Sequence, residues 1–165
     1  MKKNGVTLIE MVAVITLIAV AIPVLLRLYA NVASKSIRSE AMSAATFYAE
    51  ETMEEIRMRH FDNNTASPWS AILGPETGEV YPSGYDDVDD FNGRTDSPAT
   101  GYTRTVTVEY VTLGASETID GSTATPWVSA ASGTTTNYKR VTVSVSRTDN
   151  TVANVDLQVI MVGNG

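Results

Sequence analysis

The stretch from Gly5 to Leu26, GVTLIEMVAVITLIAVAIPVLL, decides the fold of this chain. Its apolar part, from Val6 to Leu26, has about 21 residues, which form roughly 30 Å of α-helix and can cross the hydrocarbon core of a membrane. Glu10 is the only ionisable side chain in this run. Length and composition therefore predict a membrane-spanning helix with one carboxylate near its start.

The residues before the apolar run predict a short leader that is removed. MKKNG (residues 1–5) carries two lysines, which favour a cytoplasmic amino end by the positive-inside tendency. The apolar run itself is expected to be kept. Arg27 and Tyr29 follow it, without the small-residue cleavage site that ends an ordinary secretory signal.

Glu10 needs a partner, because an unpaired carboxylate inside a membrane costs at least a few kcal/mol. The sequence offers no cation nearby. A cut after Gly5 would create a new α-amino group at Val6, and this cation could pair with the Glu10 carboxylate of a neighbouring copy. Cleavage would then create the contact through which copies assemble.

The run Gly5-Val6-Thr7-Leu8-Ile9-Glu10, followed by an apolar helix, resembles the amino terminus of type IV pilins and type II secretion pseudopilins. The resemblance implies that prepilin peptidase cuts after Gly5, that Val6 is then N-methylated, and that Glu10 guides subunits into a filament. Phenylalanine or methionine is commoner than Val6 at the first mature position. A plain membrane anchor with an incidental Glu10 is the alternative interpretation.

The resemblance also implies partners and a location. The partners are other pilin or pseudopilin subunits, prepilin peptidase, an inner-membrane assembly platform and membrane lipid. The chain is expected as a single-pass inner-membrane protein with its bulk in the periplasm, and later in a pilus or pseudopilus filament. Many major pilins share a carboxy-terminal disulfide loop, and the absence of cysteine here favours a pseudopilin or minor subunit. A net charge of −7 disfavours nucleic acid as a partner.

Pro23 lies inside the apolar run, where it removes one backbone hydrogen bond and predicts a kink. A functional joint and an incidental kink are both open interpretations. Residues 6–29 form the expected transmembrane and filament-core helix. Small and apolar residues then recur at steps of three and four from Ala30 to Ile56, so residues 30–60 predict an amphipathic continuation that ends near His60.

Residues 61–100 predict a loop region with four prolines and no sustained period. Within it, YDDVDDFNG (85–93) concentrates acidic side chains. Calcium binds six to eight oxygen ligands, so a calcium site is a hypothesis here, but the spacing fails the EF-hand pattern. An acidic turn anchored by Tyr85 and Phe91 is favoured instead. The candidate calcium ligands are Asp86, Asp87, Asp89, Asp90 and Asn92.

The acidic string and AEETMEEI (49–56) also resemble the pilin subfamily that includes the mannose-sensitive haemagglutinin pilin D proteins. This second resemblance is less specific and favours a minor subunit.

Residues 101–165 predict an antiparallel sheet, because apolar residues alternate with polar ones from Tyr102 to Tyr110, from Val141 to Ser146 and from Ala153 to Met161. The apolar faces of the last two strands both fall on odd numbers. The hairpin between them therefore needs a loop with an odd number of residues, and three residues around Asn150 would serve. Residues 114–137 are expected as an exposed excursion.

The sequence predicts no catalysis by the chain itself. His60 is the only histidine and there is no cysteine, so neither a zinc site nor a Cys-His nucleophile can be built. The expected fold is α+β, pilin-like, with the long amino-terminal helix packed on a carboxy-terminal antiparallel sheet. The expected function is a structural subunit, a minor pilin or pseudopilin. The alternative is a membrane-anchored adhesin or binding module that uses residues 114–137.

Overall fold

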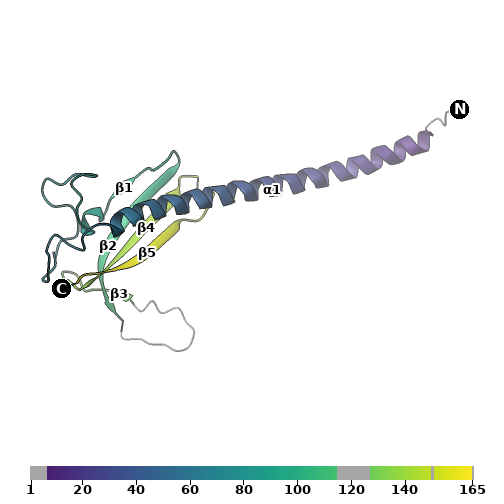
Figure 1. Ribbon diagram of the computed structural model, residues 1–165. Helices are drawn as coiled ribbons and strands as arrows, with labels where there is room; N and C mark the ends of the chain where they lie inside the picture. Colours follow the sequence, from purple (N-terminus) through teal and green to yellow (C-terminus); the bar gives the residue numbers. More distant parts are fainter. Residues whose placement is uncertain (1–6, 115–126, 150, 165) are drawn as a thin grey trace. The chain divides into compact units, whose positions relative to one another are not determined.

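The computed structural model describes residues 7–114, 127–149 and 151–164. Over these residues the chain forms one long helix, one 3-10 helix and five strands (Figure 1). The helices are α1 (Leu8–Arg57) and η1 (Asp89–Phe91), and the strands are β1 (Thr95–Asp96), β2 (Tyr102–Leu113), β3 (Trp127–Ser129), β4 (Tyr138–Arg147) and β5 (Val155–Val162). An apolar amino-terminal helix and a carboxy-terminal antiparallel sheet confirm the predicted α+β fold.

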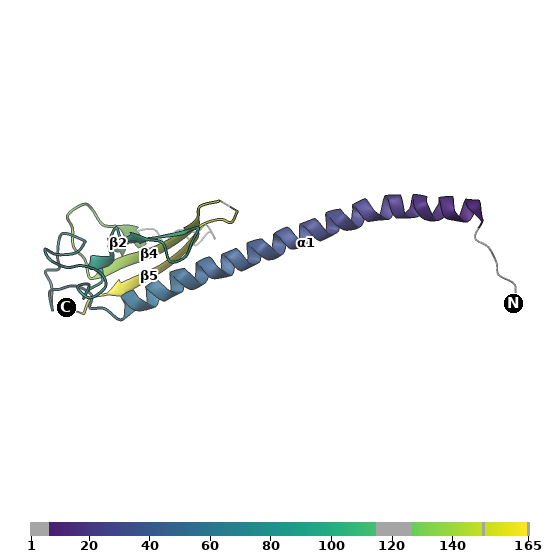
Figure 2. The same ribbon diagram turned by 90° about the horizontal axis from the view of Figure 1, so that it is seen from above.

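The chain divides into two compact units, residues 1–41 and residues 42–165. The described part of the first unit is almost entirely helical, and Figure 2 shows α1 as one helix. The second unit contains the last four turns of α1 together with η1 and the whole sheet.

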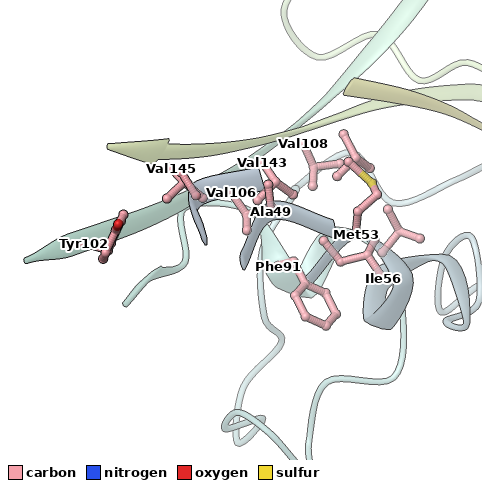
Figure 3. Close-up of a cluster of buried hydrophobic side chains, with 12 residues drawn as sticks. Ala49, Met53, Ile56, Phe91, Tyr102, Val106, Val108, Val143 and Val145 are labelled. Atoms are coloured by element: carbon pink, nitrogen blue, oxygen red, sulfur yellow. The ribbon is translucent and has the colours of Figure 1, made fainter. Parts of the chain in front are cut away.

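The core of the second unit lies between the end of α1 and one face of the sheet (Figure 3). Ala45, Ala49, Met53 and Ile56 recur at steps of three and four, so they share one side of the helix and are buried there. The valines of β2 and β4 supply the opposing face, because alternate residues of a strand point to the same side. The buried valines are Val106, Val108, Val141, Val143 and Val145.

The sheet has the order β1-β2-β4-β5 with antiparallel pairing throughout, and β3 pairs with β2 outside this path. Val141 pairs with Val159, and Val145 pairs with Val155. The odd-numbered faces of β4 and β5 therefore match, as the sequence predicted. The connection is longer than the expected three residues, because pairing between these strands stops at Val145 and Val155. Asn150 lies outside the described residues.

Two short strands were not predicted. β1 adds two residues to the edge of β2, with Thr95 opposite Thr105. β3 lies within the expected excursion of residues 114–137 and pairs with the end of β2. Both strands are too short to show an alternating pattern, so they depend on the neighbour that supplies their hydrogen bonds.

Helix α1 ends at Arg57, three residues before the predicted end. The N–H groups of Met58 and Arg59 donate to the carbonyls of Glu55 and Ile56, which lie three residues back and tighten the last turn. The N–H of His60 instead donates to the Asp86 carbonyl at 3.3 Å. This contact takes the chain out of the helix and into the loop region.

Candidate assembly helix and acidic loop

The first unit presents a helix whose apolar side chains are exposed on every side. An 18-residue window of α1 has a mean hydropathy of 2.7, and none of it is buried. Fully burying one large apolar side chain is worth about 1.5–3 kcal/mol, so this surface strongly favours lipid or another apolar surface over water. Among the described residues, this one helix is long and apolar enough to span a membrane.

Glu10 lies in the first turn of this helix with an exposed side chain. Its backbone N–H donates to the Thr7 carbonyl at 3.1 Å, so the helix is already formed at this residue. A carboxylate in the first turn is favoured by the partial positive charge of the helix amino end. Gly5 and Val6, the predicted cleavage residues, lie outside the described residues.

Polar groups inside the apolar helix are mostly satisfied within it. The Thr16 hydroxyl donates to the carbonyls of Val12 and Ala13 at 3.0 and 2.9 Å. Pro23 has no N–H, so the Ala19 carbonyl loses its helical partner. The helix nevertheless continues through Pro23 without a break. A joint at this residue stays a prediction.

Four of the five predicted calcium ligands use a side-chain oxygen to bind another group of the chain. The Asp87 Oδ1 atom accepts the N–H groups of Asp89 and Asp90, at 2.9 and 3.2 Å. The Asp90 Oδ2 atom accepts those of Asp86 and Asp87, at 2.8 and 3.1 Å. These carboxylates fold the acidic string back on itself and hold η1, because short side chains compete for backbone donors in turns.

Two more of the predicted ligands, Asp89 and Asn92, bind groups outside the turn. The Asp89 Oδ1 atom contacts the Lys139 ammonium at 2.5 Å. The Asn92 Oδ1 atom accepts the N–H of Val108 at 2.9 Å, which fastens the loop to β2. Asp87, Asp89, Asp90 and Asn92 thus bind other groups of the chain, and a cation site made of all five residues stays a prediction. The ring centroids of Tyr85 and Phe91 lie 5.1 Å apart, and Phe91 is buried, which agrees with their predicted role as anchors.

A fully buried ammonium group is the main polar feature that the sequence analysis missed. The Lys139 Nζ atom lies 3.0 Å from Asp62 Oδ2 and 2.5 Å from Asp89 Oδ1, and it donates to the Phe61 carbonyl at 2.6 Å. It also lies 5.3 Å from the ring centroid of Tyr110, whose hydroxyl donates to Asp62. We call Lys139, Asp62 and Asp89 the buried lysine cluster. A buried charge needs partners of this kind.

The carboxyls of this region have shifted pKa values. Burial raises the pKa of Asp62, but the N–H of Asn64, the ammonium of Lys139 and the N–H of Ser70 outweigh it, so the pKa of Asp62 is lowered. Burial raises the pKa of Asp89 despite its contact with Lys139.

Asp87 lies next to the buried lysine cluster, and its pKa is raised. Burial, followed by the neighbouring Asp89, raises the pKa of Asp87 to about 8. The Asp87 Oδ2 and Asp89 Oδ2 atoms are both buried without a hydrogen-bond partner if the two groups are ionised. A proton kept on Asp87 and donated to Asp89 resolves this, because two adjacent buried carboxyls cannot both ionise cheaply. The raised pKa of Asp87 therefore favours its neutral form at pH 7.

A second buried cation, Arg104, ties the helix to the sheet within the second unit. Its guanidinium makes two bonds to Asp96, at 2.9 and 2.8 Å, in the bidentate geometry that suits arginine. The Arg104 Nη1 atom also donates to the Tyr48 carbonyl of α1 at 3.0 Å. Both cations lie on the core-facing side of their strands, because alternate residues of a strand point to the same face. Lys139 lies two residues before the buried Val141, and Arg104 lies two residues before the buried Val106. That parity is the signal that could have found them.

No protein-family model, no curated protein and no solved structure matches the chain. The fold and the candidate site define an α+β protein with one exposed apolar helix and a sheet-containing unit that encloses a buried lysine.

Proposed function

We propose that the chain is a structural subunit of a type IV pilus or a type II secretion pseudopilus, built into the filament through the first part of α1. The proposal rests on the exposed apolar helix with its single carboxylate, Glu10. The run Gly5 to Glu10 and the order of a long helix before an antiparallel sheet agree with the same family. The subunit is processed by prepilin peptidase and waits in the inner membrane.

The chemistry of assembly follows from the charges at the amino end. Cleavage after Gly5 removes two lysines and leaves an α-amino group at Val6, four residues before Glu10. In an apolar surrounding, the ionised Glu10 is costly until a cation neutralises it. The Val6 amino group of an adjoining copy supplies that cation and fixes the offset between two helices. The apolar side chains then bury one another when the subunit leaves the lipid.

Replacement of Glu10 by alanine tests this function. The variant should insert and be cut like the wild type, but its amount in sheared filaments should fall about ten-fold or more, which corresponds to a loss of about 1.4 kcal/mol in the docking step. Glu40→Ala is the matched control, because Glu40 is an exposed glutamate farther along α1. Immunoblots of the filament and membrane fractions provide the measurement.

The alternative function predicts a different outcome of the same experiment. An adhesin or binding module that uses α1 only as an anchor should keep its amount and activity at the cell surface when Glu10 is replaced. Wild-type incorporation of Glu10→Ala would therefore contradict the filament proposal. Half of the segment 114–137, to which the alternative assigns binding, lies outside the described residues.

A further inference from the structure

Lys139 and Asp89 place an amine and a carboxyl in direct contact inside the second unit. The Lys139 Nζ atom lies 2.5 Å from Asp89 Oδ1, and both side chains are essentially inaccessible to water. The ring centroids of Phe61 and Tyr110 lie 4.5 and 5.3 Å from the same Nζ atom. The carboxyl carbon of Asp89 is one bond from the contacting oxygen, so it lies within reach of the amine.

Asp87 supplies a proton donor to Asp89. The Asp87 side chain is fully buried and hydrogen-bonds that of Asp89. The Asp89 Oδ2 atom is buried and has no partner unless Asp87 donates to it. Burial, followed by the contact with Asp89, raises the pKa of Asp87 to about 8, which favours the proton-bearing form at pH 7. Such an acid can protonate the oxygen that leaves a carboxyl when an amine attacks it.

Asp62 supplies a base on the same ammonium group. Its Oδ2 atom accepts from Lys139 Nζ at 3.0 Å. Burial raises the pKa of Asp62, but its hydrogen bonds outweigh burial, so the pKa is lowered and Asp62 stays a carboxylate. Burial raises the pKa of Asp89. Asp62 can therefore take a proton from the ammonium, whereas Asp89 is the carboxyl that the amine attacks.

We propose that Lys139 and Asp89 form an amide bond between their side chains, which is an intramolecular isopeptide bond. A bond forms between Lys139 Nζ and the Cγ atom of Asp89, and the bond from Cγ to Oδ2 breaks. Two of the three ammonium protons leave with Oδ2 as one water molecule. The third stays on the amide nitrogen, where the Phe61 carbonyl already accepts from Nζ at 2.6 Å.

The other groups of the site are not consumed. Asp62 and Asp87 relay protons and return to their initial states, so the reaction needs no co-reactant. Groups that a protein holds in reactive contact reach effective concentrations of about 10⁵–10⁸ M. The amide also removes two buried charges and the cost of keeping them away from water. The ion pair of Lys139 and Asp89 is the reactant state, and it holds the cluster together until the bond forms.

The bond would link β4 to η1 in a chain that has no cysteine. Lys139 and Asp89 are 50 positions apart in the sequence. A covalent link across such a loop restricts the unfolded chain in the same way as a disulfide, and it raises the stability of the second unit. This inference is independent of the proposed function of the chain.

Tryptic digestion of the full chain, purified in detergent micelles, followed by mass spectrometry, tests the bond. Trypsin does not cut after a lysine whose side chain is acylated. We expect a branched product in which residues 60–94 are joined to residues 105–140, with a mass lower by one water molecule than the sum of the two peptides. Fragmentation of this product should place the link on Asp89. Free peptides 60–94 and 105–139 without the branched product would overturn the proposal, and so would a link to Asp62.

Asp87→Asn tests the relay of protons. Asparagine keeps the oxygen that accepts the N–H groups of Asp89 and Asp90, but it cannot pass a proton to Asp89. In chains refolded from inclusion bodies into micelles, the branched product should form about 100-fold more slowly than in the wild type. Asp86→Asn, which replaces an exposed acid of the same turn, should react at the wild-type rate. Tryptophan fluorescence checks that both variants fold, and equal rates for Asp87→Asn and the wild type would overturn the role of Asp87.

Discussion

Replacement of Lys139 by methionine should destabilise the second unit more than any surface change. Methionine keeps a similar length and apolar stem but removes the ammonium that contacts Asp62 and Asp89. The Phe61 carbonyl loses its donor at the same time. Because Lys139, Asp62 and Asp89 are all essentially inaccessible, water cannot replace the lost contacts.

The loss of stability in Lys139→Met depends on the partners that Asp62 and Asp89 keep. Asp62 keeps donors from the N–H groups of Asn64 and Ser70 and from the Tyr110 hydroxyl, so it stays partly satisfied. Asp89 keeps no charged partner, since Lys139 is its only ion pair among the described residues. Removing one partner of a buried pair costs about 3–5 kcal/mol. For a domain with a total stability of about 5–15 kcal/mol, this is a large fraction.

Urea unfolding of the full chain in detergent, followed by tryptophan fluorescence, measures this loss. Trp69 reports on the region because its ring lies 4.9 Å from that of Phe61. Lys35→Met, at an exposed lysine of α1, is the control and should change stability by less than about 0.5 kcal/mol. The double variant Lys139→Met with Asp89→Asn should recover part of the loss, because it removes the unpaired charge. A loss below about 1 kcal/mol for Lys139→Met, or no recovery in the double variant, would refute the reasoning.

Two further predictions concern the same unit. The pKa of Asp87 is raised to about 8 in the folded chain, whereas the unfolded state releases this proton near pH 4. The stability that this proton contributes therefore falls as the pH rises from about 4 to about 8, and it levels off above that. Asp87→Asn keeps the accepting oxygen and should flatten this fall, which urea unfolding at pH 5, 7 and 9 would detect; an unchanged pH profile would argue against the shared proton. A Cβ at Gly163 would lie 2.8 Å from atoms of both Phe61 and Trp69. Gly163→Ala should therefore cost about 1–3 kcal/mol, and a wild-type thermal midpoint would show that the rings move aside freely.

The sequence predicted the elements whose residues repeat over many positions. The alternation in β2, β4 and β5 identified their faces, and the parity of Val141 and Val159 required the odd-numbered connection that the register shows. The steps of three and four in α1 identified part of its buried side, including Ala41 and Ile56, but they did not identify Ala49 and Met53. Such patterns can be recognised in the sequence because each face of the element meets one environment, apolar or aqueous, over its whole length.

The features that depend on contacts between distant residues could not be predicted. Lys139 meets Asp62 only because β4 is placed beside the loop that follows α1. The acids of residues 85–93 looked like one cluster, but their carboxylates bind backbone donors and Lys139 in different directions. Alternation does not encode such pairings, because they are set by the tertiary arrangement.

The central claim is that cleavage after Gly5 frees an amino group at Val6 to neutralise Glu10 on the adjoining copy. Intact-mass spectrometry of the chain from sheared, functional filaments tests it most directly. The account predicts a chain that begins at Val6 and carries one additional methyl group. Functional filaments built from chains that still carry residues 1–5 would contradict it.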